Sequence, residues 1–138
     1  MPLATSQKIQ VLIVDDSLDM LDIYKAMFEG EGRFVIDLMS DVVEALRKLD
    51  TKHYDLIVLD SVIMPHTCES FVVYLRGHMK MMDLPVIVVT ALDVHTLNVI
   101  TGLAHVSILQ KPIRKEDLFK AIDESLQRSE LHPVSGAL

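Results

Sequence analysis

The sequence has almost no cysteine, so it lacks the disulfide bonds that stabilise many secreted proteins, and it has no segment resembling a membrane span. Only one of its 138 residues is cysteine, so Cys68 has no partner for an internal disulfide, which fits a reducing compartment. No apolar run approaches the roughly 20 residues of a membrane-spanning helix, and the first residues lack the basic-then-apolar order of a secretory signal. We therefore expect a soluble, cytoplasmic protein that does not contact a membrane.

Clustered positive charge is also missing. The formal net charge is −7, from 20 acidic and 13 basic residues. Residues 1–69 carry 13 acidic and 6 basic side chains and residues 70–138 carry 7 of each, so the whole negative excess lies in the first half. A nucleic-acid-binding protein needs a clustered basic face, and neither half supplies one. Direct binding of nucleic acid is therefore not expected.

Length and apolar content indicate one globular domain. A chain of 138 residues, of which 50% are hydrophobic, is long enough to bury an ordinary core. We expect the domain to span residues 8–129, with a flexible N-terminus at 1–7 and a C-terminal tail at 130–138.

Five short apolar segments are expected to be strands. Three of them are rich in β-branched residues and do not alternate with polar residues, which is typical of strands buried on both faces of a parallel sheet. Two weaker segments complete the set. In chain order, the five segments are 11–14, 34–38, 56–59, 86–89 and 106–109.

Segments with helical periodicity separate these strands. In the first, apolar residues recur every three or four positions over 18–28, and Gly30 follows as a stop signal. Further helices are expected at 42–49 after a cap at Ser40 or Asp41, at 71–79, at 94–102 and around 118–125. This alternation of strand and helix predicts an α/β fold in three layers, with a doubly wound, five-stranded parallel sheet.

Polar side chains follow several of the predicted strands. Asp15 and Asp16 follow the first apolar run, Asp60 the third and Thr90 the fourth, and Lys111 comes just after the fifth. Ligands of open α/β sheets bind beyond the carboxyl ends of the strands, so these side chains are expected to meet at one edge. Several carboxylates in one pocket repel one another unless a cation neutralises them, and Mg²⁺ prefers such oxygen ligands. One carboxylate is then available as a nucleophile toward phosphorus, with Lys111 and Thr90 contacting the phosphoryl oxygens.

Each of these residues also has an ordinary explanation when it is taken alone. Aspartate after a strand commonly starts a turn or caps a helix, and Asp15 and Asp16 directly precede Ser17 at the start of the first helix. For any single position the turn or cap is the favoured explanation. Four strand ends that carry suitable side chains together favour a shared site.

The combination of motifs resembles the response-regulator receiver domains of two-component signalling, over residues 8–128. The matching segments are VLIVDDS at 11–17, LIVLD at 56–60, VIVVTA at 86–91 and the Lys111-Pro112 pair. The resemblance implies a flavodoxin-like fold with strand order 2-1-3-4-5. It also implies a signalling domain of a phosphorelay that promotes its own phosphorylation and is not a conventional enzyme.

The resemblance assigns roles to the acidic residues. Asp60 would accept a phosphoryl group from a sensor histidine kinase or a histidine phosphotransfer protein. Asp15, Asp16 and Asp60 would hold Mg²⁺, together with the main-chain carbonyl of Val62.

The remaining motif residues also receive roles from the resemblance. Thr90 and Lys111 would contact the phosphoryl group, and the bond between Lys111 and Pro112 would be a cis peptide. The surface formed by residues 92–128 would contact a downstream protein, which the sequence does not identify.

Two positions depart from the family pattern. Receivers place a Met-Pro proline four residues after the phosphoacceptor, whereas Pro65 lies five residues after Asp60, so the loop has one extra residue. Ile108 replaces the aromatic residue that usually lies three residues before the lysine. These changes leave open a second hypothesis, a pseudo-receiver that binds partner proteins without phosphorylation. A hydrolase with an aspartyl-phosphate intermediate ranks last, because Val62 stands where such enzymes carry a second aspartate.

Overall fold

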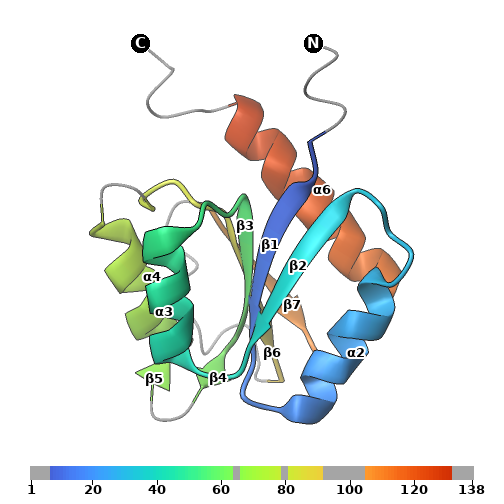
Figure 1. Ribbon diagram of the computed structural model, residues 1–138, viewed down its shortest axis with the longest axis horizontal. Coiled ribbons are helices and arrows are strands. Elements are labelled where there is room, and N and C mark those ends of the chain that lie inside the picture. The colour runs from blue at the N-terminus through green and yellow to red at the C-terminus, as the bar shows by residue number, and fades with distance from the viewer. Residues whose placement is uncertain (1–6, 64–65, 79–80, 92–104, 132–138) are drawn as a thin grey trace.

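Five parallel strands form the central sheet of the protein (Figure 1). The computed structural model describes residues 7–63, 66–78, 81–91 and 105–131. The strands are β1 (Ile9–Val14), β2 (Phe34–Met39), β3 (Leu56–Asp60), β6 (Val86–Thr90) and β7 (Val106–Gln110). They pair in the order β2-β1-β3-β6-β7, with every pair parallel. The predicted fold class and the predicted strand order 2-1-3-4-5 are confirmed.

Helices cover both faces of the sheet. The described helices are α2 (Leu18–Phe28), α3 (Val42–Thr51), α4 (Cys68–Arg76) and α6 (Lys115–Leu131). Figure 1 shows α3 and α4 on one face and α2 and α6 on the other, which makes three layers. The helix expected at 94–102 lies outside the described residues. Among the helices that the structure describes, none is long and apolar enough to cross a membrane.

Each face of the sheet has its own apolar core. Leu12 and Val14 of β1 belong to the cluster shared with α3 and α4. Val11 and Ile13, the intervening residues, belong to the cluster shared with α2 and α6. Successive strand residues point to opposite faces, so a strand buried on both sides needs apolar residues at every position. This requirement explains why the central strands appear in the sequence as unbroken apolar runs.

The ends of two helices follow local signals in the sequence. Ser17 caps α2, because its hydroxyl accepts a hydrogen bond from the Met20 N–H at 3.2 Å. Asp41 caps α3 by accepting from the Val43 N–H at 2.7 Å, so the second of the two predicted caps is the one used. Gly30, just after α2, has a φ of +82°, a left-handed conformation that glycine adopts without a steric penalty.

The region after β3 differs from the sequence prediction. α4 begins at Cys68, three residues before the predicted start at Phe71, and it ends at Arg76. Before it lies a two-stranded antiparallel hairpin of β4 (Val62–Ile63) and β5 (His66–Thr67). Short hairpins are recognised from turn pairs such as Asn-Gly, and this segment contains none. The sequence therefore offered no turn-pair signal for the hairpin.

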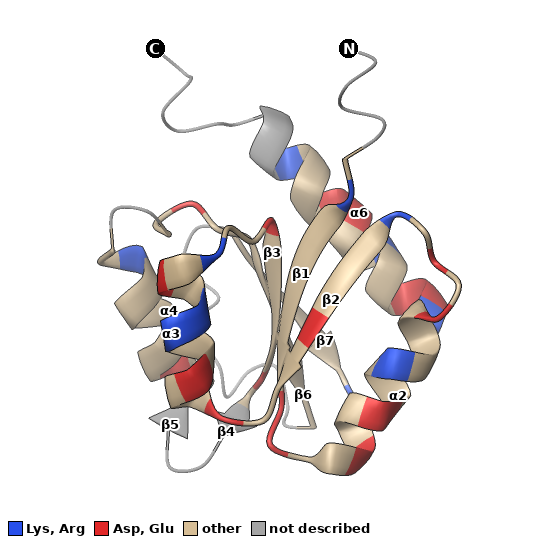
Figure 2. Cartoon of the chain, viewed as in Figure 1, with Lys and Arg blue, Asp and Glu red and all other residues tan. Residues whose placement is uncertain are grey.

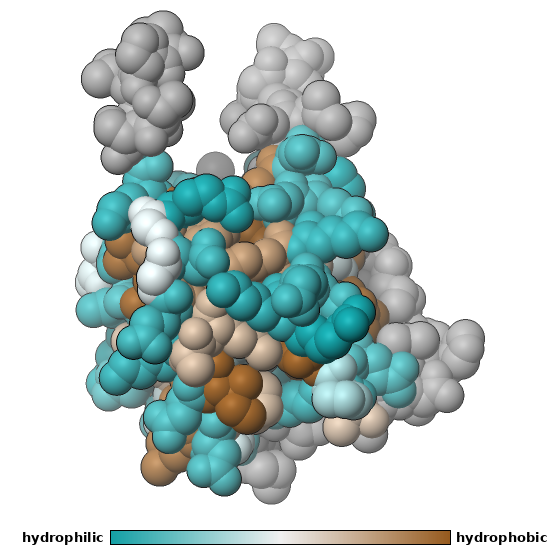
Figure 3. Space-filling model, turned by 90° about the vertical axis from the view of Figure 1, so that its right-hand side faces the viewer, coloured by the Kyte–Doolittle hydropathy of each residue, from teal (hydrophilic) through white to brown (hydrophobic). Residues whose placement is uncertain are grey.

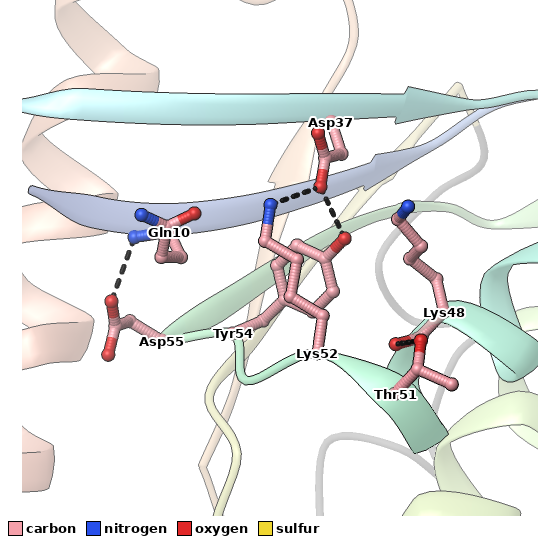
Figure 4. A network of polar contacts seen from close by, with 7 residues as sticks. All are labelled: Gln10, Asp37, Lys48, Thr51, Lys52, Tyr54 and Asp55. Atoms are coloured by element: carbon pink, nitrogen blue, oxygen red, sulfur yellow. Dashed lines mark hydrogen bonds and ion pairs between the residues drawn. The ribbon is translucent and has the colours of Figure 1, made fainter.

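A polar network ties the outer strand β2 to the segment after α3 (Figure 4). Asp37 accepts hydrogen bonds from the Lys52 ammonium at 2.8 Å and from the Tyr54 hydroxyl. Burial alone would raise the pKa of the Asp37 carboxyl, but the hydrogen bonds from Lys52 and Tyr54 outweigh it and hold that pKa below its ordinary value. The ionised form of Asp37 is therefore the form that the fold stabilises.

The Asp37 network predicts a pH-dependent contribution to stability. A carboxyl with a lowered pKa in the folded state stabilises the protein above its unfolded-state pKa of about 3.9, and this contribution is lost as the pH falls. Asp37→Asn should lower the free energy of unfolding by about 1–2 kcal/mol near neutral pH, and the difference should shrink below about pH 4. Urea unfolding of both proteins across this range measures it. A difference that stays constant into the acid range would contradict the assignment.

Candidate functional site

The carboxyl ends of the strands meet at one edge of the sheet, and the polar residues expected there are present. Asp15 follows β1, Asp60 ends β3 and Thr90 ends β6, while Lys111 follows β7. Figure 2 shows acidic positions in red just below the lower end of β1. Because all five strands run in the same direction, residues from four different parts of the chain reach the same edge.

Three carboxylates form a compact cluster at this edge. One carboxylate oxygen from each of Asp15, Asp16 and Asp60 lies within 4.8 Å of the others. Asp15 is 1% exposed and Asp60 is 9% exposed, whereas Asp16 lies at the surface. Like charges this close destabilise one another unless a cation or a proton intervenes.

Lys111 is the cation that the fold itself supplies to the cluster. Its Nζ lies 3.0 Å from Asp60 Oδ1 and 4.0 Å from Asp15 Oδ2. The backbone N–H of Lys111 donates to the Thr90 carbonyl at 2.6 Å, which holds the end of β7 against the end of β6. The Lys111-Pro112 peptide bond is cis, as predicted. One ammonium therefore lies within ion-pair distance of two of the three carboxylates.

The two carboxylate oxygens of Asp15 differ in their hydrogen bonding. Its Oδ1 accepts a hydrogen bond from the Ser17 N–H at 2.9 Å, so the turn explanation considered for this residue is also correct. Its Oδ2 is buried and accepts no hydrogen bond among the described residues. Burial raises the pKa of the Asp15 carboxyl above its usual range, and the charges of Asp60 and Asp16 add to this effect. The Ser17 N–H and Lys111 oppose the increase without cancelling it.

This donor set fits a hard divalent cation. Mg²⁺ takes oxygen ligands in an octahedron, keeps several waters, and is usually held by one or two carboxylates. Two buried carboxylates and one exposed carboxylate within 4.8 Å provide such ligands. Asp15 Oδ2 is buried, lies 4.0 Å from Lys111 Nζ and accepts no hydrogen bond among the described residues, so it is the group that a cation would satisfy. The site can therefore combine a metal, a carboxylate nucleophile and a fixed ammonium.

Thr90 and Val62 also lie near Asp60 along the chain or across the sheet. Thr90 is completely buried at the end of β6, and its neighbour Val89 is the register partner of Asp60. Val62 lies two residues after Asp60 and pairs with Thr67 in the β4–β5 hairpin. Thr90 thus ends the strand next to β3, and Val62 begins the short strand that follows β3 in the chain.

Ser61 is a residue of this region that the sequence analysis did not single out. Its N–H donates to the Val89 carbonyl at 3.0 Å, and its own carbonyl accepts from the Cys68 N–H at 3.1 Å. The residue after Asp60 is therefore fixed both to β6 and to the first residue of α4. Both bonds use only main-chain atoms, so no side-chain motif could have revealed them.

Replacing Asp15 should show how much repulsion among the clustered carboxylates lowers the free energy of unfolding. Asp15→Asn keeps an oxygen for the Ser17 N–H but removes one buried negative charge. Without metal, its free energy of unfolding should therefore exceed that of the wild type by about 1 kcal/mol. Mg²⁺ should raise the melting temperature of the wild type and leave the variant nearly unchanged. Differential scanning calorimetry with and without Mg²⁺ measures both effects.

Asp19→Asn is the matched control for this experiment, because Asp19 is exposed in the first turn of α2 and lies outside the cluster. It should lose a few tenths of a kcal/mol through the helix dipole and keep the response to Mg²⁺. A metal-free Asp15→Asn protein less stable than the wild type would show that the cluster carries no electrostatic strain.

Comparison with known proteins identified one matching family and many structures of the same fold. The sequence model described as the response regulator receiver domain matches residues 11–123. No match was found among curated protein sequences.

Several solved structures superpose on most of the chain. The receiver domain of a sensor histidine kinase from Pseudomonas aeruginosa, determined with magnesium coordinated in its active site cleft, is 21% identical with a TM-score of 0.76, covering 88% of this chain and 99% of its own. A chemotaxis response regulator from Vibrio cholerae is 22% identical with a TM-score of 0.79, covering 87% and 100%. The receiver domain of a Francisella response regulator is 26% identical with a TM-score of 0.76, covering 88% and 99%.

Proposed function

The chain belongs to the response regulator receiver domain family, and from this premise we propose that it accepts a phosphoryl group on Asp60 in a Mg²⁺-dependent reaction. The observation that carries the proposal is the environment of this carboxylate. Asp60 lies 3.0 Å from the Lys111 ammonium and shares the carboxylate cluster with Asp15, whose buried Oδ2 accepts no hydrogen bond among the described residues. A carboxylate, a cation and a set of oxygen ligands suited to Mg²⁺ lie close together, which supports the proposal.

The proposed reaction transfers phosphorus from nitrogen to oxygen. A carboxylate oxygen of Asp60 forms a bond to phosphorus while the P–N bond of a phosphohistidine breaks. The imidazole nitrogen keeps the electron pair and takes up a proton. The product is an acyl phosphate on Asp60, and the donor histidine is regenerated.

We assign the metal to the carboxylates of Asp15, Asp16 and Asp60 and to the main-chain carbonyl of Val62. When bound, Mg²⁺ supplies positive charge against the phosphoryl oxygens as the two negatively charged groups approach each other. The protein contributes a preformed set of oxygen ligands, two of them buried.

Lys111 and Thr90 complete the proposed site. Lys111 contacts Asp60 directly, and after transfer its ammonium pairs with a phosphoryl oxygen in place of the free carboxylate. The Thr90 hydroxyl donates a hydrogen bond to a second phosphoryl oxygen. Both residues end or follow strands of the sheet, so they are held in place before the donor arrives.

A protein phosphodonor fits the surface next to the site. The similar Pseudomonas aeruginosa domain belongs to a sensor histidine kinase, and we propose a histidine kinase or a histidine phosphotransfer protein as the donor. Leu18 and Ile23 on α2 are 70% and 46% exposed, and Leu18 lies two residues after Asp16. Figure 3, which views the side of the molecule with α2 and α6, shows apolar surface in its lower part. Exposed apolar residues beside a polar site are typical of docking surfaces.

The region 92–128 is the part of the chain to which we assign the binding of a downstream protein. We propose that a downstream protein binds there and that the protein acts in the cytoplasm without contacting nucleic acid. β7 and α6 are the described parts of this region, and residues 92–104 lie outside the described residues.

One experiment separates the proposed function from its alternatives. The protein is incubated with Mg²⁺ and acetyl phosphate, and intact mass spectrometry detects a covalent phosphate adduct. The proposal predicts a Mg²⁺-dependent adduct of one phosphate. Absence of both an adduct and Mg²⁺ binding would instead support a pseudo-receiver that acts by protein contact alone. Rapid catalytic release of phosphate would support a hydrolase.

A further inference from the structure

α4 is connected at its first residue to the phosphoacceptor strand. The Cys68 N–H donates to the Ser61 carbonyl at 3.1 Å, and Ser61 directly follows Asp60. Cys68 is completely buried, and burial raises the pKa of its thiol to about 11, so its side chain packs as an apolar group. One main-chain hydrogen bond therefore links the residue after Asp60 to the start of this helix.

The last residue of α4 is connected to the start of β7, the end of that strand far from Lys111. The half-buried guanidinium of Arg76 donates from Nη1 to the Met81 carbonyl at 3.1 Å and from Nη2 to the His105 carbonyl at 3.3 Å. His105 directly precedes β7. A buried guanidinium that loses such acceptors incurs a desolvation penalty, so the end of α4 and the start of β7 are held together.

His105 is itself in an unusual position. Its φ is +63°, in the left-handed region that residues with a side chain adopt infrequently. Its carbonyl accepts from the Val86 N–H at 2.9 Å as well as from Arg76. One carbonyl thus joins the start of β6, the start of β7 and the end of α4.

These contacts form a continuous series that starts and ends at Asp60. From Asp60 the connection runs through Ser61 and α4 to Arg76, then to His105, along β7, and finally to Lys111, whose Nζ contacts Asp60. Side-chain packing follows the same route, because Val106 and Ile108 of β7 pack against the apolar cluster that contains the buried residues of α4.

We propose that Arg76 acts as a latch, by which we mean a contact that couples the end of α4 to the start of β7. Through this contact and α4, phosphorylation at Asp60 changes the backbone at the start of β7. This inference rests on the proposed function, since the site must be occupied for the latch to respond. Arg76 donates to the Met81 and His105 carbonyls, which lie away from the strand end that carries Asp60, so it is proposed as a positioning residue. Its role is to transmit a change across the sheet, from the edge that carries Asp60 to the edge where β7 begins.

The test uses beryllofluoride with Mg²⁺ as a stable phosphoryl mimic, and backbone amide chemical shifts as the readout. In the wild type, saturating beryllofluoride should shift the amides of Thr90 and Lys111 at the site and of Val106 and Ser107 at the start of β7. In Arg76→Met the site shifts should remain while those of Val106 and Ser107 are lost. Arg76→Lys, which keeps the charge but cannot span both carbonyls, should retain part of the response and serves if the methionine variant folds poorly.

Arg128→Met is the matched control, because Arg128 reaches Ser107 of the same strand from α6, with Nη2 at 3.0 Å from the hydroxyl. It should leave the response of Val106 intact. Beryllofluoride shifts at Val106 and Ser107 that are equal in wild type and Arg76→Met would overturn the latch. So would a wild type in which Thr90 and Lys111 respond but the start of β7 does not. No response at any of these amides would overturn the proposed function, and the latch with it.

Discussion

Asp60→Asn should abolish covalent phosphorylation by acetyl phosphate. Asparagine preserves the shape of the side chain and an oxygen for the Lys111 ammonium, but a neutral amide does not attack phosphorus. The wild type should show a Mg²⁺-dependent adduct by intact mass spectrometry, and the variant should show none under the same conditions. We expect complete loss of the adduct. Among the described aspartates of the cluster, Asp60 is the one at hydrogen-bond distance from Lys111.

Asp50→Asn is the control for this prediction. Asp50 is an exposed aspartate near the end of α3, and its described ion-pair partner is His78 at 3.9 Å. The control should be phosphorylated at the wild-type rate. An adduct of equal yield on Asp60→Asn would exclude Asp60 as the acceptor and move the chemistry to another side chain.

Lys111→Met should slow phosphorylation by about 10²-fold or more, because it removes a preorganised charged donor from the reacting centre. Methionine retains the length and the apolar stem of the lysine. The variant also removes the ammonium that pairs with Asp60 and Asp15, so its metal-free form should lose stability while its affinity for Mg²⁺ is retained or increased. Stopped-flow or quenched-flow measurement of phosphorylation with acetyl phosphate gives the rate, and calorimetry gives the affinity.

Lys115→Met provides the comparison for Lys111→Met. Lys115 forms a surface ion pair with Glu31 at 3.1 Å and is 43% exposed, outside the acidic edge. Such pairs contribute about 0–1 kcal/mol, so this variant should react at the wild-type rate. Equal rates for both lysine variants would show that the ammonium of Lys111 does not act on the phosphoryl group.

The sheet and the acidic edge were predictable because both depend on local patterns. Unbroken apolar runs mark strands buried on both faces, and the residue after each run lies at the carboxyl edge whatever the order of the strands. Asp15, Asp60, Thr90 and Lys111 could therefore be grouped before their distances were known. The turn role of Asp15 and its place in the cluster proved compatible, since its two oxygens have different surroundings.

Other features were not predictable, because they depend on pairs that are distant in the sequence or on main-chain atoms. The bond from Arg76 to His105 spans 29 positions and ends on a carbonyl, which every residue possesses. At the start of α4, the Cys68 N–H donates to the carbonyl of Ser61, a main-chain atom that no sequence motif marks. Asp37 appears in the sequence as a charge inside an apolar strand, and only the fold brings it to Lys52 and Tyr54.

Ile108 and the loop after Asp60 show how the departures from the family pattern are accommodated. Ile108 is partly buried against the cluster shared with α3 and α4, where its apolar side chain needs no polar partner. The loop contains the β4–β5 hairpin, and after it the Cys68 N–H donates to the carbonyl of Ser61. Neither departure separates Asp60 from Lys111, whose contact is 3.0 Å.

Chemical mapping of the acceptor residue tests whether Asp60 itself carries the phosphoryl group. Borohydride reduces an aspartyl phosphate to homoserine, so peptide mass spectrometry after phosphorylation and reduction identifies the modified residue. We expect homoserine at position 60, dependent on Mg²⁺ and acetyl phosphate, with Asp15 and Asp16 unmodified. Homoserine at Asp15 or Asp16, or a phosphorylated protein with unmodified Asp60, would contradict it.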